Sequence, residues 1–110
     1  MALAEKYLMI MTTCPDLESA ERIAGELVGK QLAACVQIVP GVKSVFRWQG
    51  EVDSAAEYLV LIKTTAAQYT AVENSINSLH SYELPEIIAV PVADGLHDYL
   101  SWIDDNTKAL

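Results

Sequence analysis

The chain has 110 residues, a length typical of one domain, and its 52% hydrophobic and 20% charged residues disfavour intrinsic disorder. A net charge of −8 with only seven Lys and Arg argues against nucleic acid and anionic membrane as partners. No apolar run is long enough to span a bilayer, and the first apolar run follows an acid instead of a basic signal region. We therefore expect one cytoplasmic domain covering residues 1–110.

A short strand and an amphipathic helix are the first predicted elements. Residues 7–13 form an apolar run typical of a buried strand. Pro15 and Asp16 end this run, and Asp16 is suited to be the N-cap of a helix that Gly29 ends. Apolar residues recur at helical spacing between these two points, at Ala20, Ile23, Ala24, Leu27 and Val28.

A long hairpin is predicted next, with arms at residues 32–48 and 51–63 and a turn at 48–50. Fully extended, the first arm would reach about 55 Å, whereas a domain of this length has a diameter of about 35 Å. The arm must therefore bend or extend beyond its domain, and Pro40-Gly41 favours a kink. Because an extended hairpin exposes unpaired backbone groups, we expect pairing with another copy of the chain and an obligate oligomer.

The remaining elements complete a known order. Residues 57–63 are apolar on both faces, as in an interior strand, and Thr64-Thr65 can cap a second helix whose stripe ends at Leu79. Residues 86–92 indicate a last buried strand, and a short helix follows Gly95. The order β-α-β-β-α-β predicts an α+β, ferredoxin-like sandwich with two helices on one face of an antiparallel sheet. The other face also looks apolar, so a partner subunit is expected to cover it.

Metal-binding chemistry is the first functional hypothesis. His80, where the second helix ends, lies close in sequence to Glu83 and Glu86, and an imidazole beside carboxylates can bind a transition metal. Cys14 follows the first strand near a helix N-terminus, a setting that can produce a reactive thiolate. Both residues have structural alternatives: a small core side chain for Cys14, and a favourable helix-dipole contact for His80.

A binding cleft is the second hypothesis. Trp48 and Tyr82 are large amphipathic residues in turn or loop positions, where they could line a pocket between subunits or simply pack. Glu57, Lys63 and Cys35 are assigned to the same intersubunit cleft, although Cys35 also suits a small buried side chain. The sequence contains no nucleotide-binding, nucleophile-elbow or zinc-finger motif, so we expect no enzyme.

Several segments resemble the CutA-type divalent-cation tolerance family. They are TTCPDLESAERIAGELVGKQLAACV, PGVKSVFRWQGEV, LVLIKTT, LHSYELPEIIAVPV and YLSWI, in this order over nearly the whole chain. The resemblance implies a ferredoxin-like subunit in a tight homotrimer similar to the P-II signalling proteins, held together by the long hairpins and by strand pairing across subunits. It also implies a role in tolerance of copper and other divalent metals. Animal members have been linked to acetylcholinesterase anchoring, which nothing in this sequence supports.

The resemblance also implies candidate metal ligands. Family members are thought to use a cysteine at the end of the first strand and a histidine that matches His80. Copper-binding members can carry the cysteine where this chain has Thr12, two residues before Cys14. Some members have two adjacent histidines where this chain has Leu79 and His80, and Ser81 replaces the usual proline.

Three functional hypotheses follow. The leading one is a cytosolic, homotrimeric protein of divalent-metal tolerance that binds Cu²⁺ or a similar ion weakly and requires no cofactor. The second is a P-II-like regulatory module that holds a small ligand or a partner in its intersubunit clefts. The third is a stable trimeric scaffold.

Overall fold

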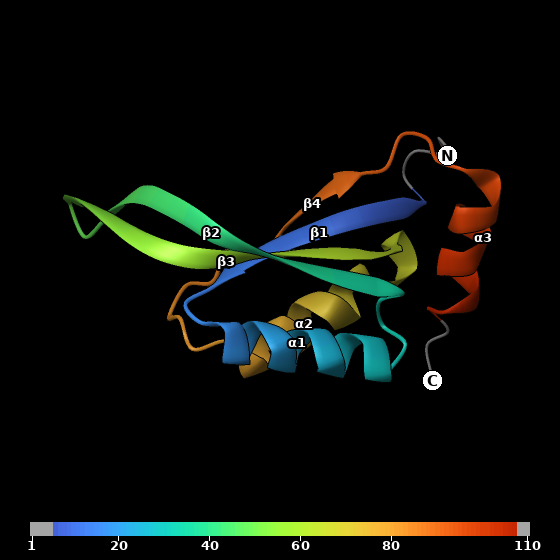
Figure 1. The fold of residues 1–110 in the computed structure, drawn as a ribbon, viewed down its shortest axis with the longest axis horizontal. Helices are drawn as coiled ribbons and strands as arrows, with labels where there is room; N and C mark the ends of the chain where they lie inside the picture. Colours follow the sequence, from blue (N-terminus) through green and yellow to red (C-terminus); the bar gives the residue numbers. More distant parts are fainter. Residues whose placement is uncertain (1–5, 108–110) are drawn as a thin grey trace.

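Two helices cover one face of a four-stranded antiparallel sheet in the computed structural model, which describes residues 6–107 (Figure 1). The strands lie in the order β2-β3-β1-β4, so the predicted ferredoxin-like α+β fold is confirmed. In chain order the elements are β1 (Tyr7–Cys14), α1 (Leu17–Gly29), β2 (Cys35–Trp48), β3 (Glu51–Thr65), the 3₁₀ turn η2 (Ala66–Gln68), α2 (Tyr69–Leu79), β4 (Ile88–Pro91) and α3 (His97–Asp105).

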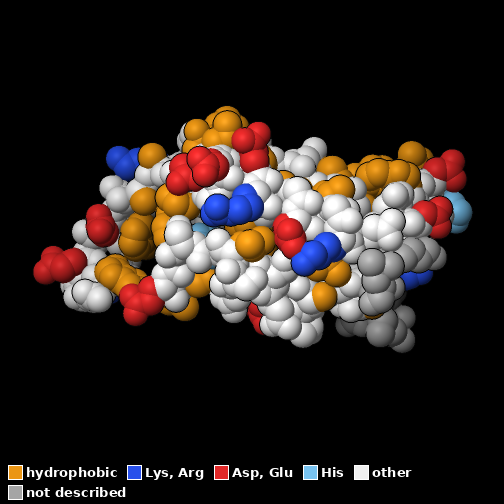
Figure 2. All heavy atoms as spheres, turned by 90° about the horizontal axis from the view of Figure 1, so that it is seen from below, with side chains coloured by type: hydrophobic (Ala, Val, Ile, Leu, Met, Phe, Trp, Pro, Cys, Tyr) orange, Lys and Arg blue, Asp and Glu red, His pale blue; other side chains and the backbone are white. Residues whose placement is uncertain are grey.

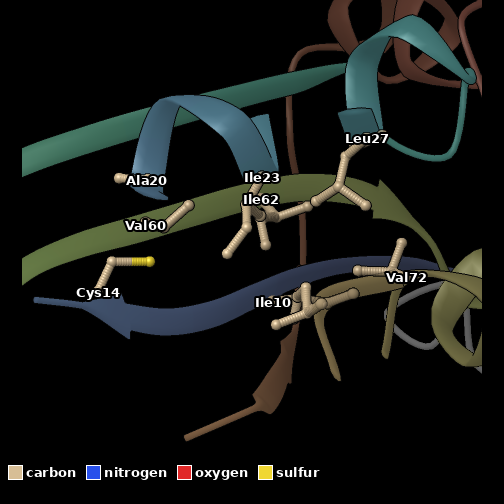
Figure 3. Close-up of a cluster of buried hydrophobic side chains, with 10 residues drawn as sticks. Ile10, Cys14, Ala20, Ile23, Leu27, Val60, Ile62 and Val72 are labelled. Atoms are coloured by element: carbon tan, nitrogen blue, oxygen red, sulfur yellow. The ribbon is translucent and has the colours of Figure 1, made fainter. Parts of the chain in front are cut away.

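The core lies between the sheet and the pair α1 and α2. Figure 3 shows side chains of β1 and β3 directed toward α1, where Ile23 and Leu27 meet Ile62. These three side chains are completely buried. On α1 the buried stripe is narrower than predicted, because Ala24 is half-buried and Val28 is 43% exposed.

The ends of α1 follow the predicted signals. The Asp16 carboxylate accepts a hydrogen bond from the Ser19 backbone N–H at 2.7 Å, as an N-cap should. The helix ends at Gly29, but the left-handed backbone conformation is adopted two residues later by Gln31, with φ 59°. The predicted capping role of Thr64-Thr65 is wrong. Thr65 precedes η2 without a side-chain cap, and the Thr64 hydroxyl donates to the Leu32 carbonyl instead.

A β-bulge divides the long hairpin into two parts. Val39 pairs with Leu59, but the next pair is Val42 with Glu57, so β2 carries one extra residue at the Pro40-Gly41 position. Gly41 has φ 80°, a conformation in which glycine is favoured. The kink predicted from Pro40-Gly41 is therefore confirmed. Because of the extra residue, even-numbered residues of β2 after the bulge lie on the face that odd-numbered residues occupy before it.

The hairpin extends beyond the rest of the sheet, as predicted. Among residues 6–107, β1 pairs with β3 only from Tyr58 to Thr65, so the part of the hairpin at residues 42–57 pairs only with itself. Gln49 and Gly50 both have positive φ, which is typical of the tight type I′ turn that matches strand twist. Figure 2 shows hydrophobic side chains gathered over this projecting end, at the left; Val45 and Val52 there are each 67% exposed.

The face of the sheet opposite α1 and α2 is only partly covered. α3 lies over one end of this face, where Tyr7, Ala34 and Ile103 form a small second cluster and Tyr7 donates a hydrogen bond to Asp104. We call the remainder the open face. It carries the outward residues of all four strands: Met9, Met11, Val39, Leu59, Leu61, Ile88 and Val90.

The prediction of a buried last strand at residues 86–92 is wrong in two respects. β4 is shorter, at Ile88–Pro91, and all its residues are exposed, with Ile88 at 50%. The reason is its position at the edge of the sheet, where it pairs with β1 alone, and an apolar composition cannot reveal this position. Within residues 6–107 no helix is long and apolar enough to cross a membrane.

Two matched substitutions on α1 test this description of the core. Ile23→Ala should lower the free energy of unfolding by about 2–5 kcal/mol, because it leaves a cavity in place of a completely buried side chain. Val28→Ala on the same helix should cost at most about 1 kcal/mol, because Val28 is already 43% exposed. Urea unfolding at one fixed protein concentration measures both values. Equal losses would contradict the assignment of the buried stripe.

Candidate functional site

His80 joins the end of α2 to the end of β1. It is the first residue after α2, where its backbone N–H still donates to the Ile76 carbonyl at 2.8 Å. Its ring Nε2 lies 2.6 Å from the Thr13 carbonyl oxygen, and its Nδ1 lies 3.1 Å from the Tyr82 backbone nitrogen. The His80 and Tyr82 rings are 4.7 Å apart between centroids. The imidazole is therefore held by groups from two elements.

Both ring nitrogens of His80 are already engaged. The Thr13 carbonyl can only accept and the Tyr82 N–H can only donate, so this geometry fits one neutral tautomer, with the proton on Nε2 and the lone pair on Nδ1. A metal binds a histidine through such a lone pair. A metal ion at His80 must therefore displace the Tyr82 N–H, or take Nε2 away from Thr13.

Cys14 is placed in the core, away from solvent. Figure 3 shows it on β1 near Ala20 and Val60, and it is completely buried. Burial raises the pKa of the Cys14 thiol, because a thiolate is poorly solvated there. Thr12, on the same face of β1, is also completely buried, and its hydroxyl oxygen has no hydrogen-bond partner among residues 6–107.

The four predicted metal donors do not form a ready cluster. Glu83 and Glu86 are exposed, whereas Cys14 is buried and His80 is half-buried. Within the described part of the chain, no three His, Cys, Asp or Glu side chains come together in a way that could hold a metal ion. A metal at this place would rely on His80 and exposed carboxylates, with Cys14 out of reach unless the core opens.

A cleft of about 670 Å³ opens between the projecting hairpin and the segment after α2. Its floor contains a hydrogen bond of 2.7 Å from the Tyr82 hydroxyl to Glu57 Oε2. Its lining includes Phe46 and Trp48 on β2 and Leu84 on the segment after α2. The volume falls within the range of small-molecule sites. Three of the predicted cleft residues, Trp48, Glu57 and Tyr82, thus lie together in one chain.

Glu57 is an unusual group for a cleft floor, because it is a carboxylate with only 6% of its surface exposed. Tyr82 is held beside it, and burial together with this hydrogen bond raises the pKa of the Tyr82 hydroxyl well above its ordinary value. Tyr82 is therefore a hydrogen-bond donor to Glu57 over the whole physiological pH range.

Lys63 and Cys35 lie elsewhere in the same chain. They are register partners near the far end of the sheet, six residues along β3 from Glu57 and so about 20 Å away. The Lys63 Nζ atom lies 3.4 Å from the Tyr99 hydroxyl and 5.4 Å from the centroid of that ring on α3. Any cleft containing all five predicted residues would have to combine residues from different subunits.

Ser44, Phe46 and Arg47 also line the cleft, although none of them was predicted from the sequence as a cleft residue. A signal for two of them was present, because strand residues alternate between faces and Ser44 and Phe46 precede Trp48 by four and two residues. Arg47 does not fit this alternation, because it is one residue before Trp48. Its Nη1 donates to the Gly50 carbonyl at 3.2 Å, across the hairpin turn.

The sequence of this chain matches a known protein family over most of its length. Residues 8–106 match the family model described as CutA1 divalent ion tolerance protein. The chain is 46% identical over 99 residues to the divalent-cation tolerance protein CutA of Thermus thermophilus, a match that covers 90% of this chain and 96% of that protein.

Two further matches show how this similarity extends. The crystal structure of CutA from Xylella fastidiosa superimposes with a TM-score of 0.91 at 46% identity, covering 94% of this chain and 99% of that one. The chloroplastic protein CutA 1 of Oryza sativa is 39% identical over 101 residues, which are 92% of this chain but 57% of the plant protein.

The reactivity of Cys14 tests its placement. In a Cys35→Ser protein, we expect Ellman's reagent to label the folded chain at least about a hundredfold more slowly than the unfolded chain, because labelling must wait for the core to open. Absorbance at pH 8 with and without guanidinium chloride measures the two rates. The reciprocal Cys14→Ser protein reports Cys35 separately. Rapid labelling of Cys14 in the folded state would show that the thiol is accessible.

Proposed function

The chain belongs to the CutA1 divalent ion tolerance protein family, and we propose that it serves divalent-cation tolerance as a homotrimer that binds Cu²⁺ or a similar ion weakly. The observation that carries the metal proposal is His80, an imidazole at the end of α2 with Glu83 and Glu86 exposed on the segment that follows. Imidazole with carboxylate oxygens is a donor set that Cu²⁺ accepts.

Weak binding is part of this proposal for a physical reason. The ion competes with the two hydrogen bonds that His80 already makes, and the carboxylates must come to it from exposed positions. A thiolate from Cys14 would strengthen the site, but the thiol is buried and its pKa is raised. The residues therefore suit an ion that is bound and released, and they do not form a permanent metal centre.

The homotrimer is supported by three features of one subunit. The open face carries apolar side chains that nothing in residues 6–107 covers, the hairpin extends beyond its own sheet, and β2 and β4 are both edge strands with unpaired backbone groups. Burying such surfaces and edges is the usual means by which proteins avoid aggregation. A scaffold with no metal role, the third hypothesis, would share this assembly.

A cytoplasmic location is also part of the proposal. Its support is the pair of free cysteines, Cys14 and Cys35, since thiols remain reduced in the cytosol. The name of the rice relative includes the word chloroplastic, so membership of the family does not by itself give the location of this chain. Cell fractionation decides this point directly.

The cleft favours a second role, as a regulatory module that binds a small ligand. The observation that carries it is the buried Glu57 carboxylate on the floor of a cleft with aromatic walls. Binding rather than catalysis is proposed for both roles, in line with relatives that are named as tolerance proteins.

Copper titration tests the metal proposal. We expect the wild-type protein to bind Cu²⁺ with micromolar or weaker affinity, and His80→Gln to weaken binding by at least about tenfold because it removes the imidazole nitrogen. His97→Gln is the matched control, since His97 lies on α3 with its side chain 91% exposed and belongs to no candidate site. Calorimetry and electron paramagnetic resonance provide the measurements. Equal affinities of wild type and His80→Gln would remove His80 from the proposal.

Sedimentation tests the assembly. The wild-type chain should sediment as a trimer at micromolar concentration, and Leu61→Asp should shift it toward monomer because a charge would be buried in the contact between open faces. Leu17→Asp is the control, since Leu17 lies on α1 with 44% of its surface exposed. A folded trimer of the Leu61→Asp chain, or a monomeric wild type, would contradict the proposed contact.

A further inference from the structure

We propose that the cleft between the hairpin and the segment after α2 binds a small organic cation, a primary ammonium group carried on an apolar body. The Glu57 carboxylate would hold the charge, and Phe46 and Trp48 would contact the body. This inference deepens the ligand-binding role proposed above for the same cleft and rests on it. It does not require a metal ion at His80.

Glu57 is incompletely paired within its own chain. Only 6% of this residue is exposed, and its Oε2 accepts one hydrogen bond from Tyr82. Among residues 6–107, no lysine, arginine or histidine forms an ion pair with it, and no second donor reaches it. A buried carboxylate with one neutral donor is poorly compensated for its lost hydration. An ammonium group would supply both the opposite charge and further N–H donors.

Aromatic side chains line the cleft around Glu57. Phe46 and Trp48 are each 39% exposed and line the cleft with Tyr82. Aromatic faces attract cations and also bury apolar groups. Walls of this kind suit an organic body better than a hydrated metal ion, and no three metal donors converge among the described residues.

The charged residues around the cleft are mostly acidic. Glu57 and Glu86 line it, and Asp53 and Glu83 line the adjoining part beside Trp48. Arg47 is the cation among these lining residues, and it is bonded to the hairpin turn through the Gly50 carbonyl. Carboxylates therefore outnumber cations, in a chain whose net charge is −8. The resulting negative potential favours the binding of cationic ligands and disfavours the binding of ligands that carry a phosphate or carboxylate group.

The competing occupant is a lysine of a second copy. Lys63 lies on the same face of β3 as Glu57, and another subunit could bring its own Lys63 to this carboxylate. The experiment must therefore distinguish a free cation from a neighbouring side chain, using the assembled protein.

The test compares 2-phenylethylammonium with 2-phenylethanol, which has a similar shape and no charge. A Trp102→Phe background leaves Trp48 as the single tryptophan, so its fluorescence reports binding at the cleft. We expect saturable binding of the ammonium probe and at least about tenfold weaker binding of the alcohol, because a charge-assisted hydrogen bond is lost. Glu57→Gln should weaken ammonium binding by a similar factor. Asp98→Asn, which removes an exposed carboxylate on α3, should leave it unchanged.

The outcomes separate the parts of the proposal. Equal binding of the two probes would overturn the cationic class while leaving a ligand-binding cleft, whereas no saturable binding of either probe would count against both. Binding of the ammonium probe by Lys63→Met but not by the wild type would show that a neighbouring lysine fills the cleft, which also overturns the proposal. Tyr82→Phe keeps the carboxylate, so a retained preference for the ammonium probe in that variant supports Glu57 even if Glu57→Gln folds poorly.

Discussion

The extra residue that β2 carries between Val39 and Val42 determines what the hairpin presents to the open face. Strand side chains alternate strictly, so one inserted residue moves every later side chain to the opposite face. Before the bulge the odd-numbered residues of β2 share a face with Leu59 and Leu61, and after it the even-numbered residues do. Phe46 and Trp48 therefore stand on the same side as Glu57. Without the bulge they would face away from it.

Tyr82 connects this hairpin face to the helical layer. Its hydroxyl donates to Glu57 on β3, and its backbone N–H donates to His80 at the end of α2. His80 in turn contacts the backbone of Thr13. A ligand in the cleft and a metal at His80 would thus act on the same short segment. The two proposed sites are adjacent, so occupation of one site would affect the other through the position of Tyr82.

The sequence predicted features that repeat along the chain better than contacts that join distant parts of it. Periodicity located α1 and the two arms of the hairpin, and Pro40-Gly41 marked the bulge. The sequence could not show that the partner of the His80 ring is a backbone carbonyl 67 residues away, because every residue has such a carbonyl. The order of the predicted elements predicted the overall fold, and the resemblance to a known family implied the same fold. Neither signal revealed that, within its own chain, the Lys63 side chain contacts Tyr99 on α3 instead of Glu57.

The bond between Tyr7 and Asp104 has a consequence for the order of folding. β1 is the first strand synthesised, yet it lies inside the sheet, and its pairing needs β3 and then β4. Its first residue is also held by α3, the last helix (Figure 1). On a ribosome, β1 must therefore wait at least until β3 has emerged before it can pair, while α1 and the hairpin can form from local contacts. β1 thus leaves the ribosome before the strands it pairs with, and its apolar residues are the ones that a chaperone would need to protect meanwhile.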